Sequence, residues 1–215
     1  MPNLGLWQLD RLEWKNELLN NISSRQAADN ITFPYNESLE DFEYRNTSVE
    51  GKFLDNTQTF FFRPNLSGQS GYNVISAFKT IDDSVVYVDI GWIPFEQKEN
   101  IDFLDIDYNK NFSLKGILIS SKERNMFSPE NDYIKNIWYT LSSTEMNKFY
   151  KLNGSFFILK IIDQNYFEQT LIEFNPTQIP NNHLQYAGTW FLLFIVVGIL
   201  YFYQVYQIIR IKWNT

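Results

Sequence analysis

The chain has 215 residues, a net charge of −7 and no cysteine. The acidic balance argues against a nucleic-acid partner, because phosphate binding needs a basic surface. The lack of cysteine excludes disulfides, thiolate nucleophiles and zinc sites built on cysteine.

The N-terminal segment is predicted to be a helix over Leu4–Leu19. Its large side chains recur at spacings of three and four, as one face of a helix requires: Trp7, Arg11, Trp14 and Leu18. The next segment, Asn20–Glu43, is polar and contains Pro34, so we expect a loop with one helical turn near Ser38.

Short β-prone runs fill the middle of the chain. The predicted strands are Tyr44–Leu54, Thr59–Phe62, Tyr72–Phe78, Val85–Trp92, Phe112–Ser120, Asn136–Leu141, Phe156–Ile162 and Phe167–Phe174, the last as the neighbour of the strand before it. One short helix interrupts them, because Ser142 to Glu145 fits a capping box and Gly154 stands where a following turn is expected. Short strands joined by brief turns predict an α+β fold with an antiparallel β-rich soluble domain, shaped as a barrel or a sandwich.

A long apolar stretch ends the chain. No charged residue occurs from Leu184 to Ile209, and about 20 apolar residues suffice to cross a bilayer. Arg210 and Lys212 follow directly, so the positive-inside rule places the C-terminal tail on the inner side and the bulk of the chain opposite. The predicted organisation is an N-terminal helix (1–20), a soluble β-rich domain (21–180), a transmembrane helix (184–209) and an inner-side tail (210–215).

The chain lacks the residues that several enzyme classes require. The single histidine, His183, stands at the membrane boundary, so a Ser-His-Asp triad is not expected, and no phosphate-binding glycine motif occurs. The run Asp105–Asn109 begins like a calcium loop, but Lys110 and Gly116 replace its glycine and its final glutamate. Pairs of carboxylates leave acid–base catalysis open, yet the sequence favours a protein that is not an enzyme.

His183 begins a distinctive helical face. Tyr186, Ala187 and Trp190 follow it at steps of three, four and seven, so they share its side of a helix. Neutral imidazole is a common axial ligand of haem iron, and aromatic rings can stack on a flat cofactor. The candidate site is therefore His183 as the iron ligand, lined by Tyr186 and Trp190. The alternative is an interfacial aromatic belt that binds no cofactor.

The stretch Asn181–Phe191 resembles the C-terminal signature N-x-H-x-x-Y-A-x-T-W-F of the Surfeit locus protein 1 family of cytochrome c oxidase assembly factors. Further blocks resemble the family in the same order along the chain: Leu4–Lys15 with its Gly-x-Trp-Gln-x-x-Arg pattern, Tyr44–Phe53, Ser70–Phe78, Val85–Pro94 and Asn136–Trp138. The blocks span almost the whole chain.

The resemblance implies a specific function. Family members have two membrane helices that bracket an outer domain, they assist maturation of oxidase subunit I, and bacterial members bind haem a. The signature histidine falls on His183, which makes it the candidate haem ligand, with Tyr186 and Trp190 beside it. The expected partners are oxidase subunits, chiefly subunit I, and the lipid bilayer. The expected location is the mitochondrial inner membrane with the domain in the intermembrane space, or a bacterial plasma membrane with a periplasmic domain.

The chain also departs from the family pattern. Residue 1 falls where the first membrane helix should end, so we expect that helix to be truncated, separately encoded or lost. Ile90 replaces an arginine, Ser76-Ala77 replaces Thr-Pro, and Ser142 stands near an expected aspartate. These changes suggest, as the alternative, a permanent accessory subunit of the oxidase without cofactor. A third possibility, a glycosylated single-pass surface protein, rests on N-x-S/T sequons such as those at Asn21, Asn65 and Asn153.

Overall fold

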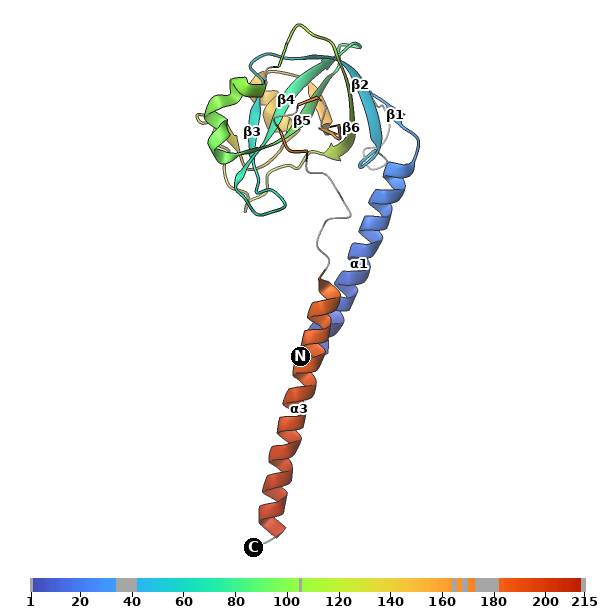
Figure 1. Cartoon of the computed structure of the whole chain (residues 1–215), viewed down its shortest axis with the longest axis vertical. Helices are drawn as coiled ribbons and strands as arrows, with labels where there is room; N and C mark the ends of the chain where they lie inside the picture. Colours follow the sequence, from blue (N-terminus) through green and yellow to red (C-terminus); the bar gives the residue numbers. More distant parts are fainter. Residues whose placement is uncertain are drawn as a thin grey trace. The chain divides into compact units, whose positions relative to one another are not determined.

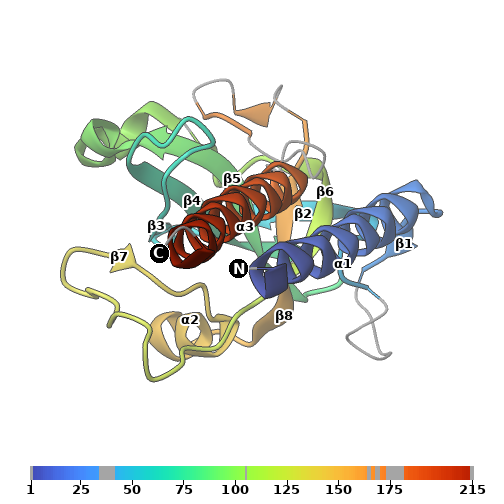
Figure 2. The ribbon, with the colours of Figure 1, turned by 90° about the horizontal axis from the view of Figure 1, so that it is seen from below.

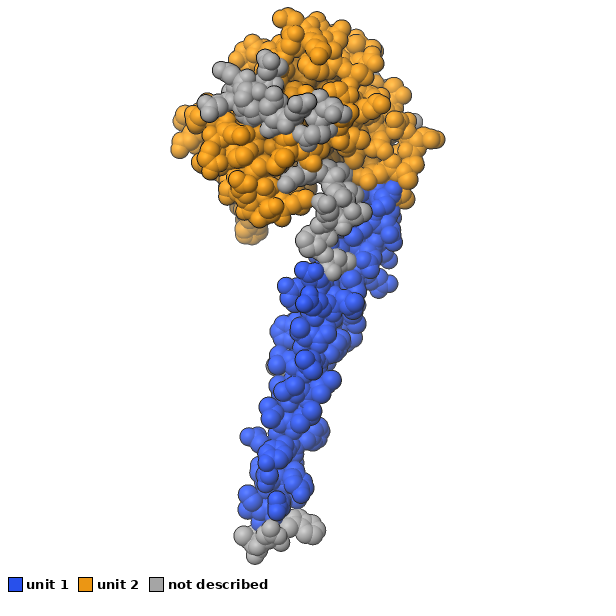
Figure 3. Space-filling view, viewed as in Figure 1, with its two compact units in different colours: residues 1–23, 175–215 blue, residues 24–174 orange. Residues whose placement is uncertain are grey.

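A computed structural model describes residues 2–33, 42–104, 106–163, 166–167, 170–172 and 182–213 of the chain. The chain divides into two compact units, coloured separately in Figure 3. We call residues 1–23 with 175–215 the helical unit, and residues 24–174 the barrel unit.

Figure 1 shows the elements in chain order. They are α1 (Pro2–Ala27), β1 (Ile31–Thr32), β2 (Asn46–Phe53), β3 (Thr59–Phe62), β4 (Gly71–Thr80), β5 (Val85–Pro94), the 3-10 helix η2 (Phe95–Leu104), β6 (Phe112–Ser120), β7 (Ile137–Trp138), α2 (Ser143–Tyr150), β8 (Gly154–Ile161) and α3 (His183–Trp213).

The strands form a closed barrel. Their order is β1-β2-β6-β8-β5-β4-β3-β7, and a further pairing of β2 with β4 closes the ring. Gly51 stands where β2 pairs with both β6 and β4, and a Cβ there would lie 2.0 Å from the Lys79 carbonyl oxygen. Only glycine lets the two backbones approach so closely. The prediction of an α+β fold with a β-rich barrel is confirmed, although β8 pairs in parallel with β5 and antiparallel with β6.

The barrel interior is packed with aromatic and branched side chains. Phe53 of β2 lies at its centre, with edge-on ring contacts to Phe78, Phe112 and Phe167 at centroid distances of 5.0, 5.3 and 5.7 Å. Along β2, buried and exposed positions alternate, as the sequence pattern of that strand predicts. This alternation sets the register, since a slip by one residue would expose Val49 and Phe53.

A second apolar cluster covers the outer face of β4, β5 and β8. α2, which lies against β8, contributes to it (Figure 2). The cluster consists of Ile75, Ala77, Tyr87, Trp138, Met146 and Ile158. The Tyr87 hydroxyl donates to Oδ1 of Asn147 on α2 at 2.9 Å, and burial raises the pKa of Tyr87 above its usual value. Because both of their faces are covered, β4 and β5 consist of almost continuous buried residues.

The N-terminal helix is longer than predicted. It runs to Ala27 because Asn20–Ala27 contains neither glycine nor proline, so nothing in this polar stretch breaks a helix. The loop expected over Asn20–Glu43 is therefore wrong at its start, and Ile31–Thr32 also pairs with β2 as a short strand. The turn predicted near Ser38 lies outside the described residues.

Three further expectations differ from the structure. β7 is limited to Ile137–Trp138, because the next two backbone N–H groups donate to Oδ1 of Asn131 instead of to a strand. Gly154 begins β8 rather than forming a turn, and a Cβ on it would lie 2.7 Å from the Tyr87 ring. The residue that ends α2 in the left-handed conformation is Lys151. Within the described part of Phe167–Phe174, Leu171 bridges to Trp92 of β5, not to β8.

The serine half of the predicted capping box of α2 is present, while the Glu145 carboxylate bonds to Asn131 and pairs with Arg124 instead. Ser142 is the N-cap, and its side chain accepts a hydrogen bond from the Glu145 backbone N–H at 3.1 Å. We expect Ser142→Ala to lower the free energy of unfolding by about 1 kcal/mol, because the N–H loses its acceptor. Chemical denaturation followed by tryptophan fluorescence measures this change. An exposed serine, Ser113, provides the control: Ser113→Ala should leave the midpoint unchanged, and an equal shift in both variants would contradict the capping role.

Candidate functional site

The helical unit contains the predicted site. α3 is 31 residues long, which corresponds to roughly 46 Å at 1.5 Å per residue. Among the described residues, His183–Ile211 is the one helix that is long and apolar enough to span a membrane. Its apolar side chains are largely exposed, as expected for a helix whose surroundings are lipid. His183 is the first residue of this candidate span.

α1 and α3 pack against each other in opposite directions. Gly5 lies against Phe191, and a Cβ on Gly5 would lie 2.7 Å from the far end of the Phe191 ring. One turn further along α1, Gln8 contacts His183, which is two turns earlier on α3 than Phe191. Ala187, midway between these two α3 residues, is buried. Small residues at Gly5 and Ala187 thus let the helices approach closely.

The contact between Gln8 and His183 fixes the imidazole. Nδ1 of His183 lies 2.7 Å from Oε1 of Gln8, and the ring is partly buried. In this orientation of the Gln8 amide its oxygen faces the ring, and an amide oxygen can only accept, so the hydrogen bond is formed by the tautomer with the proton on Nδ1. The lone pair is then on Nε2, the arrangement that a metal-binding histidine needs when its other nitrogen donates to the protein. The donor set therefore fits an axial ligand of haem iron.

The other predicted site residues share the first two turns of α3. Tyr186 is 54 % exposed, and Trp190 is partly buried. Both rings therefore keep part of their surface uncovered. Tyr186 and Trp190 are thus available to line a ligand at His183, while Ala187, the fourth member of this face, is covered.

Gln8 and Gly5 were missed as site residues by the sequence reasoning. Both stand in the Gly-x-Trp-Gln block, which contributed only to the resemblance. The signal that could have found them is that this block and the histidine signature lie at opposite ends of the chain. Two helices that bracket one domain can bring such blocks together.

We expect Gly5→Leu to displace Phe191 and loosen the pairing of α1 with α3, because the added side chain occupies the position of that ring. The chain has no native cysteine, so Gln8→Cys with His183→Cys, whose native side chains lie 2.7 Å apart, gives a unique pair for a short thiol-reactive cross-linker. Cross-linking should fall several-fold in Gly5→Leu. In the matched variant Leu9→Ile, at an exposed position of α1, it should be unchanged. Equal yields in all three proteins would contradict the close approach at Gly5.

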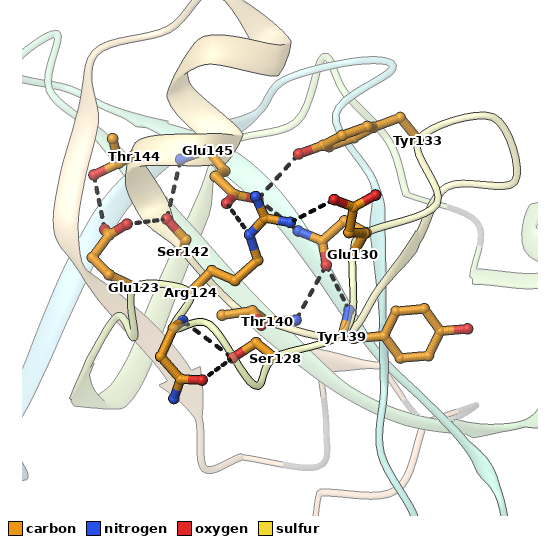
Figure 4. Close-up of polar contacts among 12 residues, drawn as sticks. Glu123, Arg124, Ser128, Glu130, Tyr133, Tyr139, Thr140, Ser142, Thr144 and Glu145 are labelled. Atoms are coloured by element: carbon orange, nitrogen blue, oxygen red, sulfur yellow. Dashed lines mark hydrogen bonds and ion pairs between the residues drawn. The ribbon is translucent and has the colours of Figure 1, made fainter.

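The barrel unit carries a separate polar network around α2 (Figure 4). Glu123 accepts hydrogen bonds from the hydroxyls of Ser142 and Thr144 at 2.8 and 2.9 Å. Glu145 accepts from Nδ2 of Asn131 at 2.7 Å and forms an ion pair with Arg124 at 3.5 Å. These bonds link the segment before β7 to the first turn of α2. Negative charge is favourable there, because the N-terminus of a helix carries a partial positive charge. The network is thus satisfied internally and stabilises the fold.

A charged pair is buried on the outer face of the barrel. Nζ of Lys160 lies 3.3 Å from Oδ2 of Asp89, and the two side chains are only 5 % and 8 % exposed. Nδ2 of Asn73 donates to both carboxylate oxygens at 2.9 Å, and the Gly91 N–H donates to Oδ1 at 3.1 Å. Protein donors therefore replace bulk water as the hydrogen-bond partners of the buried carboxylate. The sequence analysis did not single out these residues.

Comparisons with known proteins place the chain in one family. The SURF1 family model matches residues 1–195. A SURF1-like protein of Rickettsia felis is 32% identical over 208 residues, covering 93% of this chain and 89% of that protein. A SURF1-like protein of Dictyostelium discoideum is 25% identical, covering 93% and 90%. Surfeit locus protein 1 of Gallus gallus is 25% identical, covering 95% and 71%. The match of the family model over most of the chain, together with these relatives, shows that the chain belongs to the SURF1 family.

Proposed function

We propose that this protein is a non-enzymatic assembly factor for cytochrome c oxidase, which holds haem a at His183 and assists its insertion into subunit I. SURF1 family proteins are generally known as cytochrome c oxidase assembly factors. The observation that carries the haem assignment is the 2.7 Å hydrogen bond from Nδ1 of His183 to Gln8, since it leaves Nε2 as a ligand.

Haem a would be the cargo of this site, and the chain's own residues have separate roles in it. His183 would supply the axial nitrogen, and Gln8 would hold the ring in one tautomer and orientation. Tyr186 and Trp190 would line the apolar faces of the macrocycle. The site would stand at the first turn of the candidate membrane span, so the apolar tail of haem a could lie along α3 in the lipid.

We propose an oxidase-bearing membrane as the location. This is the mitochondrial inner membrane with the barrel unit in the intermembrane space, or a bacterial plasma membrane with the barrel unit in the periplasm. The relatives include both bacterial and eukaryotic proteins. Arg210 and Lys212, which follow the apolar stretch in the sequence, support an inner-side C-terminus by the positive-inside rule.

The residues that depart from the family pattern all lie in the barrel unit. Ile90, Ser76 and Ala77 are fully buried in the barrel unit, and Ser142 is the N-cap of α2. All four positions therefore serve strand packing or helix capping within the barrel unit. Their divergence is accommodated by the fold, and it gives no separate support to an accessory subunit without cofactor.

Association with the oxidase tests the proposal. The full chain, tagged and purified from its native membrane, should carry subunit I in incomplete oxidase complexes and should be sub-stoichiometric in the mature enzyme. Oxidase purified through another subunit supplies the reverse comparison. One-to-one presence in the mature enzyme would instead identify a permanent accessory subunit, and absence of subunit I from the purified material would overturn the proposal.

A further inference from the structure

A pocket of about 510 Å³ opens on the outer face of the barrel unit, within the size range of small-molecule sites. Its floor contains the buried Asp89 and Lys160 pair with Asn73. The segment that leads to β7, whose side chains appear in Figure 4, forms the opposite wall. All of its lining residues belong to the barrel unit, and none of them is a residue of the predicted haem site.

The acidic groups of the pocket already have partners. Asp89 is paired with Lys160 and accepts hydrogen bonds from Asn73 and Gly91. Glu123 accepts hydrogen bonds from two hydroxyls at the start of α2. A cationic ligand would have to compete with these existing partners, and it would lose its own hydration at the buried carboxylate. The pocket is therefore poorly suited to a cation.

Two further cations line the same pocket and remain exposed. Arg63 follows β3, and Lys122 follows β6. Neither head group has an ion-pair partner in the part of the chain that the structure describes. With Lys160 the lining holds three cations against two carboxylates, a net charge of +1 in a chain whose total is −7. A guanidinium and an ammonium at one opening favour a carboxylate, which arginine can bind through two parallel hydrogen bonds.

The remaining wall is apolar and only partly covered. Phe61, Ile119 and Leu141 are half-buried lining residues, and Tyr139 is 40 % exposed at the same opening. Exposed apolar side chains inside a concave surface gain stability when a ligand covers them. An inorganic anion would pair with the cations but leave this apolar wall exposed to water, whereas a flat organic ligand would cover the wall.

We propose that this pocket binds a small organic carboxylate with an apolar, ring-sized body. The carboxylate pairs with Arg63 and Lys122 at the opening, and the body lies on the wall of Phe61, Ile119 and Leu141. The buried pair of Asp89 and Lys160 holds β5 and β8 together beneath the ligand and gives the floor a fixed shape. This inference is independent of the proposed haem site.

A matched pair of probes tests the proposal on the full chain in lipid nanodiscs. The probes are 6-fluoro-2-naphthoate and its neutral amide, observed by fluorine NMR line broadening, with empty nanodiscs as the reference for lipid partitioning. The naphthoate should bind the chain at least about five-fold more tightly than the amide, which corresponds to about 1 kcal/mol. The combined variant Arg63→Gln/Lys122→Gln should abolish that preference. Both residues are exposed, so the fold should remain intact by circular dichroism.

The control variant removes two exposed cations elsewhere on the barrel, Lys79→Gln/Lys115→Gln, and should leave naphthoate binding unchanged. A third variant, Leu141→Trp, should weaken both probes because it fills the apolar wall. Three results would overturn the proposal: binding no stronger than to empty nanodiscs, equal affinities for the two probes, or equal losses in the two double variants.

Discussion

Haem a content of the purified chain should fall at least about 100-fold in His183→Ala, because this change removes the axial ligand as well as its orientation. His183 is the only histidine of the chain, so no other imidazole can replace it. The measurement is the ratio of haem to protein, from pyridine haemochrome spectra, after purification from cells that produce haem a. The rest of the protein should be unaffected, since the partly buried ring belongs to the helical unit and not to the barrel core.

Two further variants separate ligation from positioning. In Gln8→Leu the imidazole keeps its place but loses the acceptor for Nδ1–H, so we expect about a ten-fold loss of haem affinity. Gln185→Ala changes an exposed residue of the same helix and should leave the haem content unchanged. Equal haem content in His183→Ala and the unmodified chain would remove the histidine from the mechanism. A wild-type value in Gln8→Leu would remove only the role of Gln8.

Lys160→Met should lower the free energy of unfolding of the barrel unit by about 3–5 kcal/mol. The change leaves the Asp89 carboxylate buried without its counter-charge, and a single uncompensated charge in a protein interior is strongly destabilising. Chemical denaturation of the full chain in detergent, followed by tryptophan fluorescence, measures the loss. Two of the six tryptophans, Trp92 and Trp138, belong to the barrel unit and are buried there, so their exposure reports its unfolding.

Neutralising both partners should restore much of this stability. In Lys160→Met/Asp89→Asn, the side chain at position 89 keeps an oxygen that can accept from Asn73 and Gly91 but carries no charge. As a matched control, Lys79→Met breaks an ion pair whose side chains are 48% and 85% exposed, and it should change stability by less than about 1 kcal/mol. Losses of similar size in Lys79→Met and Lys160→Met would show that burial of the pair has no special effect.

Local patterns were sufficient to predict most of the barrel elements. β3 and β6 have the predicted bounds, and β2, β4, β5 and β8 agree with the predicted runs within two residues at each end. These strands are rich in aromatic and β-branched residues, and the cap at Ser142 depends only on residues within one turn. The boundaries failed where tertiary contacts decide them. Gly154, for example, is required by its packing on Tyr87 and not by a turn.

Contacts between distant residues could not be predicted in this way. Closure of the barrel depends on the pairing of β2 with β4 at Gly51, and β8 lies between β5 and β6. The two residues of the site contact, Gln8 and His183, are 175 positions apart in the sequence. Periodicity identified the α3 face with His183, Tyr186 and Trp190, but it carries no information about which other helix packs on that face. For the same reason the pairing of Asp89 with Lys160, on parallel neighbouring strands, left no local signal.

The single histidine allows a direct test of iron ligation. The full chain, labelled with ¹⁵N only at histidine and purified with its haem a, should show one ¹⁵N hyperfine coupling to the ferric iron in pulsed electron paramagnetic resonance, because His183 is the sole source of that label. The coupling should disappear when the same label is used in His183→Ala. A haem-loaded chain without any ¹⁵N coupling, or a chain that acquires no haem under these conditions, would contradict the assignment of His183 as the haem ligand.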